Sequence, residues 1–214
     1  MTITVDEAVR DTVRPAVVVR RGVTVHAHDA RLDAPLAAAA EALRTRTDLD
    51  APLAATRAMY KRFGIDPTKT RPSSEALLRR VRKGDPLPRV NGLVDLVNWC
   101  SAETQISFGL YDLGQVQPPI TLRIGDPGEG YDGIRKDHVN VEGRLCLADS
   151  VGPFGNPTSD SARTMTTPQT RDVMVVLFVP AQTSDAAAAQ ALALTRERFA
   201  TYAGGSEDAE LTSR

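Results

Sequence analysis

Three polar side chains in the segment 86–98 (PLPRVNGLVDLVN) have the types and spacing to recognise a small ligand. Asn91, Asp95 and Asn98 are four and three residues apart, so on a helix they form one polar stripe. Carboxamides both donate and accept hydrogen bonds, so such a stripe could line a pocket, and it could equally face water. The apolar residues of the same segment are expected to lie away from the stripe: Leu93, Val94 and Val97.

The remaining candidates for chemistry are sparse. His26 and His28 would share one face of a strand beside Asp29, but the only other histidine is His138, so the ligand set for a metal is thin. Surface histidines are the expectation, with no metal and no cofactor. The two cysteines form no CxxC pair, and the chain has no P-loop, no GxGxxG after a strand, no HExxH and no GxSxG.

A basic segment distinguishes the chain from an evenly charged protein. Residues 57–89 contain ten Lys or Arg against three acids, a surplus of seven, whereas the whole chain has a net charge of -1. A local surplus of this size can attract a polyanion by contacts with its phosphates. The alternative is an ordinary solvated face in an arginine-rich composition, because the chain has 22 Arg and 4 Lys.

The bulk composition indicates an ordinary globular chain. Its 214 residues are 42% hydrophobic and 25% charged, which suits one domain at residues 1–204 followed by a flexible tail at 205–214. No apolar run approaches the ~18 residues of a membrane span, and the first residues lack the pattern of a signal peptide. We therefore expect a cytoplasmic protein without membrane contact.

Helix signals dominate the first half of the chain, where capping residues and apolar spacing mark where each helix begins and ends. Two short β segments around the turn at Arg21-Gly22 precede them, within 15–27. Helices are then predicted at residues 33–46, 50–63, 73–83 and 90–103.

Strand signals dominate from residue 104 onwards. The segments QISFGLYDL, ITLRIG, RLCLAD and DVMVVLFV alternate with turn residues, and the last is apolar throughout, which is typical of a strand buried on both faces. A long polar segment lies at 150–171, and a last helix is predicted from Ser184-Asp185 to about Tyr202. Helices first and strands later predict an α+β layered fold.

Four short motifs resemble a known family. VNGLVDLVN, YDL at 111–113, ITLRIGDPGEGY at 120–131 and LCLAD at 145–149 follow the order of the B3/B4 editing domain in the bacterial phenylalanyl-tRNA synthetase β subunit. The chain also resembles free-standing B3/B4 domain proteins, and the resemblance covers about residues 55–180. It implies mixed, layered β-sheets with helices packed outside, and it implies hydrolysis of a wrongly esterified tRNA.

The resemblance also implies roles for single residues. Asn98, Asn91 and Asp95 match the first motif and are the expected catalytic set, in which the asparagines orient the substrate amine, carbonyl or water. The matching positions for substrate binding are Asp112, Arg123 and Glu129, and Asp149 matches the aspartate of the last motif. Hydroxyl groups of the long polar segment are expected at the mouth of the pocket: Ser159, Ser161, Thr164 and Thr167.

Three departures from the family pattern bear on specificity. Val97 stands where the family has threonine, Gly109 where it has histidine, and the strand DVMVVLFV lacks the glutamate that recognises a tyrosine hydroxyl. A buried hydroxyl without its partner is strongly disfavoured, so an aminoacyl group other than tyrosine is expected.

The expected function is therefore a trans-editing hydrolase that removes the amino acid from mischarged tRNA. The basic helix would hold the phosphates of the acceptor end, and Ser74 and Glu75 are expected to cap that helix. The expected phosphate contacts are Arg71, Arg79, Arg80, Arg82 and Lys83. The alternatives are a non-catalytic module that binds aminoacyl groups or tRNA, and a hydrolase of small esters or amides. The alanine-rich helices at 36–46 and 185–201 could pack on a second copy in a homodimer.

Overall fold

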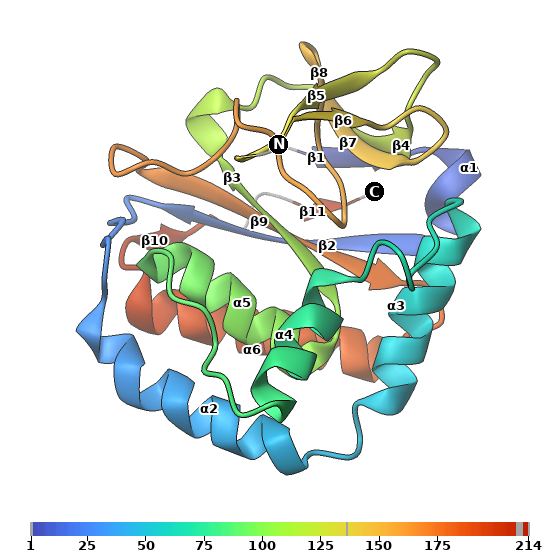
Figure 1. The fold of residues 1–214 in the computed structure, drawn as a ribbon. Helices are drawn as coiled ribbons and strands as arrows, with labels where there is room; N and C mark the ends of the chain where they lie inside the picture. The colour runs from blue at the N-terminus through green and yellow to red at the C-terminus, as the bar shows by residue number, and fades with distance from the viewer. Residues whose placement is uncertain (1, 136, 209–211, 214) are drawn as a thin grey trace.

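Two larger β-sheets, a two-stranded sheet and a layer of helices form the described part of the molecule, and Figure 1 shows the layers one above another. The computed structural model describes residues 2–135, 137–208 and 212–213. Its strands are β1 (Thr2–Val5), β2 (Val13–Arg21), β3 (Ser107–Asp112), β4 (Ile120–Ile124), β5 (Gly130–Asp132), β6 (His138–Asn140), β7 (Leu145–Asp149), β8 (Gly152–Gly155), β9 (Asp172–Pro180), β10 (Ser206–Glu207) and β11 (Thr212–Ser213). The outer sheet has the order β11-β1-β4-β7-β8, the inner sheet has the order β10-β2-β9-β3, and β5 pairs with β6.

The inner sheet is antiparallel and lies between the two other layers. Its strand β9 is apolar on both faces, as the sequence predicts. The core between the inner sheet and the helices contains Val173, Val175 and Leu177. The core between the two sheets contains Met174 and Phe178. Because successive side chains of a strand point to opposite faces, one apolar run of eight residues supplies both cores.

A layer of helices covers the free face of the inner sheet. The helices are α1 (Glu7–Arg10), α2 (Asp33–Thr45), α3 (Asp50–Arg62), α4 (Ser73–Arg82), α5 (Gly92–Thr104) and α6 (Asp185–Tyr202), with the short 3-10 turns η1 (Ala30–Leu32) and η2 (Leu113–Gln115). Helices α2, α4, α5 and α6 share one apolar core with the inner sheet, whereas α3 contributes Met59 and Tyr60 to the core between the sheets. The α+β layered fold and the predicted helices are confirmed.

One predicted β segment is wrong. The chain after Arg21 does not return as a second strand, because Gly22 has a φ of 71° and turns the backbone out of the sheet. Val23 N then donates to Arg171 O at 2.7 Å, and Thr24 N donates to Ala203 O at 3.1 Å. These hydrogen bonds tie residues 22–24 to the ends of β9 and α6.

The segment expected to be a flexible tail takes part in both sheets. Ser206 and Glu207 pair with Arg21 and Arg20 of β2 as strand β10. Thr212–Ser213 pairs with β1 in parallel as strand β11. Residues 209–211 and 214 lie outside the described residues.

Candidate functional site

The start of α5 places the three residues of the expected catalytic set in different environments. Asn91 is the N-cap, with an extended backbone, and its Oδ1 accepts from Val94 N at 3.0 Å. Asp95 is 1% exposed and its Oδ1 accepts from Val90 N at 2.8 Å, so both side chains bind backbone N–H groups at the start of the helix. The predicted single polar stripe is wrong, because Asn91 lies outside the helix and Asp95 is turned into the protein.

Asp95 is fully engaged by an arginine that precedes the helix. Arg89 Nε donates to Asp95 Oδ2 at 2.7 Å, and Arg89 Nη2 donates to Asp29 O at 2.9 Å. The remaining nitrogen of the guanidinium bonds to Asp33 at the start of α2. Asp95 therefore joins the loop before α5 to the start of α2, and its carboxylate is held away from solvent.

Asn98 remains as the polar group of α5 that is available to a ligand. Its side chain is half-buried and forms no hydrogen bond with any residue that the structure describes. The half-buried Val94 lies one turn earlier on the same helix, so an apolar group and a free carboxamide are neighbours. The amide nitrogen of Asn91 likewise has no partner among the described residues.

Gly109 is required by the tyrosine two residues later. A Cβ at position 109 would lie 2.1 Å from the Tyr111 hydroxyl, and a Cβ at Gly155 would lie 2.2 Å from it. The Tyr111 ring is fully buried and occupies the space that a histidine at position 109 would need. Burial, followed by the effect of Asp160, raises the pKa of this hydroxyl well above its ordinary value, so it stays neutral.

Asp112 lies at the end of β3 and faces a polar cavity of about 490 Å³. Its Oδ1 accepts from Gly114 N at 2.9 Å, and its Oδ2 accepts from Thr170 Oγ1 at 2.6 Å. A carboxylate has about four acceptor positions, so Asp112 keeps capacity to bind an ammonium group. The residues that line the cavity are Asp112, Gly114, Gln115, Ala162, Arg163, Met165, Thr167, Gln169, Thr170, Arg171 and Asp172.

Arg123 and Glu129, expected at the substrate, bind each other. The guanidinium forms two parallel hydrogen bonds with the carboxylate, at 2.6 and 2.8 Å, and Glu129 Oε2 also accepts from Asp126 N. The hydrogen bonds from Arg123 hold the pKa of Glu129 below its usual value. This pair closes the turn between β4 and β5, which is a structural role.

The hydroxyl residues of the long polar segment brace that segment. Ser161 is 2% exposed and its Oγ accepts from Arg163 N at 3.0 Å. Thr164 is fully buried, and its Oγ1 lies 3.5 Å from Phe154 O. Ser159 O accepts from the Tyr131 hydroxyl at 2.6 Å. Of the four hydroxyl residues expected at the mouth of the pocket, Thr167 is the one that lines the cavity beside Asp112.

A second bidentate pair fixes the same segment to the outer sheet. Arg163 binds both oxygens of Asp149, at 3.0 and 2.9 Å, and the Asp149 side chain is fully buried. Asp149 Oδ2 also accepts from Gln117 N at 2.9 Å. The aspartate of the last motif thus positions the loop that forms one wall of the cavity.

The expected phosphate contacts are exposed; Arg79, Arg80 and Arg82 lie on α4, whereas Arg71 precedes the helix and Lys83 follows it. Arg80 Nε donates to Pro86 O and Arg82 Nη2 donates to Arg46 O, while Lys83 forms the C-cap. Neither Ser74 nor Glu75 caps this helix as predicted, although Glu75 does lie in its first turn, where a negative charge favours the helix dipole. The cap position is Pro72, without a side-chain hydrogen bond, and Ser74 Oγ donates to Gln105 O inside the protein.

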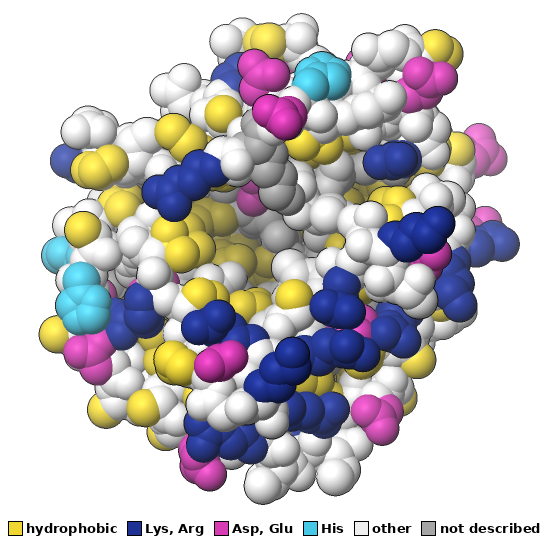
Figure 2. Space-filling model, in the orientation of Figure 1, with side chains coloured by type: hydrophobic (Ala, Val, Ile, Leu, Met, Phe, Trp, Pro, Cys, Tyr) yellow, Lys and Arg dark blue, Asp and Glu magenta, His cyan; other side chains and the backbone are white. Residues whose placement is uncertain are grey.

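Figure 2 shows where the basic side chains gather. A band of Lys and Arg runs over α4, and the same face is hollowed above this band, with hydrophobic side chains in the walls of the hollow. In the orientation of Figure 1, the hollow opens above α5, in front of the strands of the inner sheet. A basic band therefore borders a partly apolar depression on one face.

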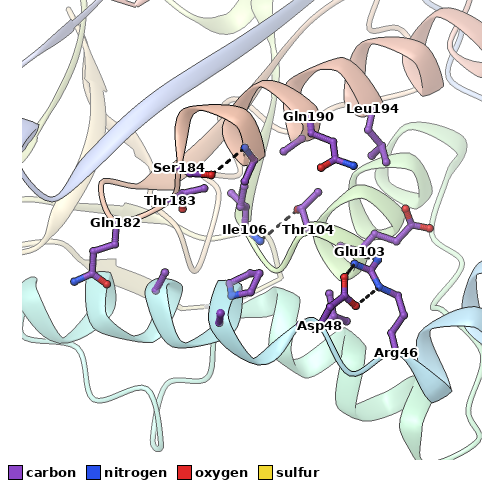
Figure 3. A pocket seen from close by; sticks show the side chains of 16 residues that line it. Arg46, Asp48, Glu103, Thr104, Ile106, Gln182, Thr183, Ser184, Gln190 and Leu194 are labelled. Atoms are coloured by element: carbon purple, nitrogen blue, oxygen red, sulfur yellow. Dashed lines mark hydrogen bonds and ion pairs between the residues drawn. The ribbon is translucent and has the colours of Figure 1, made fainter.

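Another cavity, of about 400 Å³, was not indicated by the sequence. It lies between α3, the end of α5 and the start of α6 (Figure 3). Arg46 and Asp48 form an ion pair at 2.8 Å on one side, and Gln190 and Leu194 lie on the other. Its polar residues come from segments far apart in the sequence, at 46–48, 103–104, 182–184 and 190, so no local motif could have revealed it.

The described part of the chain holds no group of three or more His, Cys, Asp or Glu side chains that could bind a metal ion. Asp29, which follows the two histidines in the sequence, pairs with Arg31 at 2.6 Å. None of the helices in the described residues is long and apolar enough to cross a membrane.

Comparison with known proteins agrees with the resemblance of the motifs. By fold, the chain is similar to the crystal structure of an N-terminal fragment of the phenylalanyl-tRNA synthetase β subunit from Pyrococcus horikoshii, with a TM-score of 0.51 and 15% identity. The similarity covers 100% of this chain and 52% of that fragment, so the chain spans about half of its length. A search of curated proteins found no match. The model of the B3/4 domain matches residues 55–211, and the chain belongs to the B3/4 domain family.

Proposed function

We propose that the protein hydrolyses the ester bond of mischarged aminoacyl-tRNA. The observation that carries the proposal is the common face of Figure 2, on which a band of Lys and Arg side chains borders a hollow in a B3/4 domain. The cations supply a surface for phosphates, and the hollow supplies space for an aminoacyl group beside them. The similar synthetase fragment supports tRNA as the partner.

The chemistry asks little of the protein, because an aminoacyl ester is intrinsically labile. The site has to hold the terminal nucleotide, orient a water molecule and stabilise the oxyanion that forms when water attacks the carbonyl carbon. Asn98 is assigned to the carbonyl oxygen or the water, since its amide is free on α5. Asp112 is assigned to the substrate's α-ammonium group, and Thr167 lies in the same cavity.

Two members of the expected catalytic set receive other roles in this proposal. Asp95 is a positioning residue, because its carboxylate is buried against Arg89 and Val90 N. Asn91 is the N-cap that fixes the first turn of α5, and its free amide nitrogen is the group left for substrate. The helix start therefore aims Asn98 and contributes one further donor.

A non-catalytic module that binds aminoacyl groups or tRNA is the second candidate. It is favoured by the loss of titratable groups from the site, since Asp95 is buried in an ion pair and the Tyr111 ring occupies the space beside Gly109. Such a protein would bind charged tRNA without turnover.

The two candidates are separated by incubating the purified chain with a panel of mischarged tRNAs and following the aminoacyl ester. Turnover of at least one of them supports the hydrolase, and saturable binding without ester loss supports the binding module. Equal turnover of free aminoacyl esters would indicate a hydrolase of small substrates instead. Asn98→Ala tests the site, with Gln190→Ala as the matched control, because Gln190 is an exposed carboxamide at the cavity of Figure 3.

A further inference from the structure

One buried carboxylate on α4 faces three arginines. Glu75 is 1% exposed, and both of its oxygens accept from Arg57 of α3, at 2.8 and 2.7 Å. Arg79 Nε lies 3.1 Å and Arg71 Nε lies 3.6 Å from the same carboxylate. We call these four residues the Glu75 cluster; it combines three positive charges with one negative charge.

Arg71 and Arg79 are held by one edge only. Each approaches Glu75 through Nε, and neither pair of Nη groups has a hydrogen-bond partner in the described part of the chain. Their side chains are 41% and 56% exposed. A guanidinium has five N–H donors in a fixed plane, so each of these two presents a free fork to solvent.

Stability of the fold does not require this arrangement. Arg57 alone binds both oxygens of Glu75 and balances its charge. Two additional guanidinium groups beside the same carboxylate add mutual repulsion, since only one negative charge is present. A surplus of two positive charges at one buried anchor is useful when an external anion completes the cluster.

The surroundings supply more cations and little negative charge. In residues 57–89 the other acids are Asp66 and Asp85, both exposed. Figure 2 shows the Lys and Arg side chains over α4 as a continuous band beside the hollow. Further exposed cations in the same part of the chain are Lys61, Arg62, Lys69, Arg80, Arg82 and Lys83.

We infer that Glu75 is a positioning residue that holds Arg71 and Arg79 as two forks for phosphodiester groups of a tRNA. The inference rests on the proposed function, which names tRNA as the partner. A planar fork binds two phosphate oxygens at once, and an arginine already held in place loses less conformational freedom on binding. Glu75 therefore strengthens the binding of a polyanion although it is itself negative.

This sign provides the test. Glu75→Gln removes one negative charge beneath the band, and Asp85→Asn removes one from its surface without touching an arginine of the cluster. If only net charge matters, both variants bind tRNA more tightly. If instead Glu75 holds Arg71 and Arg79 as a clamp for phosphates, Glu75→Gln raises the Kd for uncharged tRNA about tenfold, as expected for losing a charge-assisted contact. Asp85→Asn then leaves the Kd equal or lower.

A second pair of variants keeps the charge constant and does not disturb a buried group. Arg79→Lys replaces the fork by a point charge, whereas Arg62→Lys makes the same change at an exposed arginine without a partner among the described residues. Only Arg79→Lys is expected to raise the Kd, by about fivefold or more. Circular dichroism and thermal melting report whether each variant is folded, and if Glu75→Gln does not fold, the lysine pair decides.

The measurement uses uncharged tRNA and no turnover, so its outcome is independent of the deacylase activity. A protein that lacks deacylase activity and shows the two predicted differences retains the clamp and loses only the hydrolase proposal. Tighter binding by Glu75→Gln, or equal affinities of Arg79→Lys and Arg62→Lys, would overturn the inference.

Discussion

Two buried carboxylates in neighbouring helices, Asp95 on α5 and Glu75 on α4, differ in the number of arginines that bind them. Asp95 and Glu75 are both 1% exposed, yet Asp95 meets one guanidinium and one backbone N–H, whereas Glu75 meets three guanidinium groups. In the first arrangement one arginine serves two carboxylates, because Arg89 also binds Asp33, and the Asp95 side chain is closed to solvent. The second leaves two half-exposed arginines on the surface. In our proposal, this difference means that Asp95 stabilises the fold whereas Glu75 arranges a binding surface for phosphates.

The largest expected difference is in stability: replacing Asp95 by alanine should destabilise the fold more than replacing Glu75. Asp95→Ala breaks a buried ion pair and leaves Arg89 Nε and Val90 N without their acceptor, and the free energy of unfolding should fall by about 3 kcal/mol. Glu75→Ala should lower it by about 1 kcal/mol, because its arginines are exposed enough to recover water. Urea unfolding of both variants measures the difference. Equal losses would remove the distinction between the two sites.

Removal of arginines should differ in its effect on binding. Arg71→Ala with Arg79→Ala should weaken tRNA binding about 10- to 100-fold and reduce the dependence of log Kd on log salt by about two. The control is Arg10→Ala with Arg144→Ala, which changes the charge equally at two exposed arginines outside the basic band. Filter binding at several salt concentrations reports both quantities. If the control pair weakens binding as much, the band has no special role.

A smaller loss of stability is expected at low pH from Asp29, whose backbone oxygen binds the arginine that pairs with Asp95. Arg31, through its hydrogen bonds, holds the pKa of Asp29 below its ordinary value, and Asp29 O accepts from Arg89. The folded state thus binds fewer protons than the unfolded state, so the stability from Asp29 is present above the unfolded pKa of about 4 and is lost as pH falls through the folded value. Unfolding measured from pH 6 to pH 3 should show a shallower loss for Asp29→Asn than for the parent. The same slope for both would mean that this carboxylate contributes nothing.

The helices and the long strands could be predicted because their signals are local. Ser184 does cap α6 by accepting from Ala187 N, and the apolar run of β9 does pack on both faces. The two-residue strands β10 and β11 have no pattern of their own, since they exist only through pairing with β2 and β1, far away in the sequence.

The site was harder to predict because its polar residues found partners inside the protein. Spacing alone put Asp95 on one polar stripe with Asn91 and Asn98, but Arg89, which also binds Asp33 at the start of α2, turns it inward. Nothing in the sequence near Glu75 reveals that Arg57 on another helix reaches it. The sequence likewise does not show that a glycine is needed at position 109 because the Tyr111 ring fills the space beside it.

The deacylation rate of a mischarged tRNA at sub-saturating concentration, for the parent chain and Asn98→Ala, tests the account most directly. The account predicts loss of the ester from at least one mischarged tRNA, a rate that falls steeply with salt, and a decrease of about 100-fold in the variant without loss of folding. An ester that survives on every tRNA of the panel, or an undiminished rate in Asn98→Ala, would contradict it.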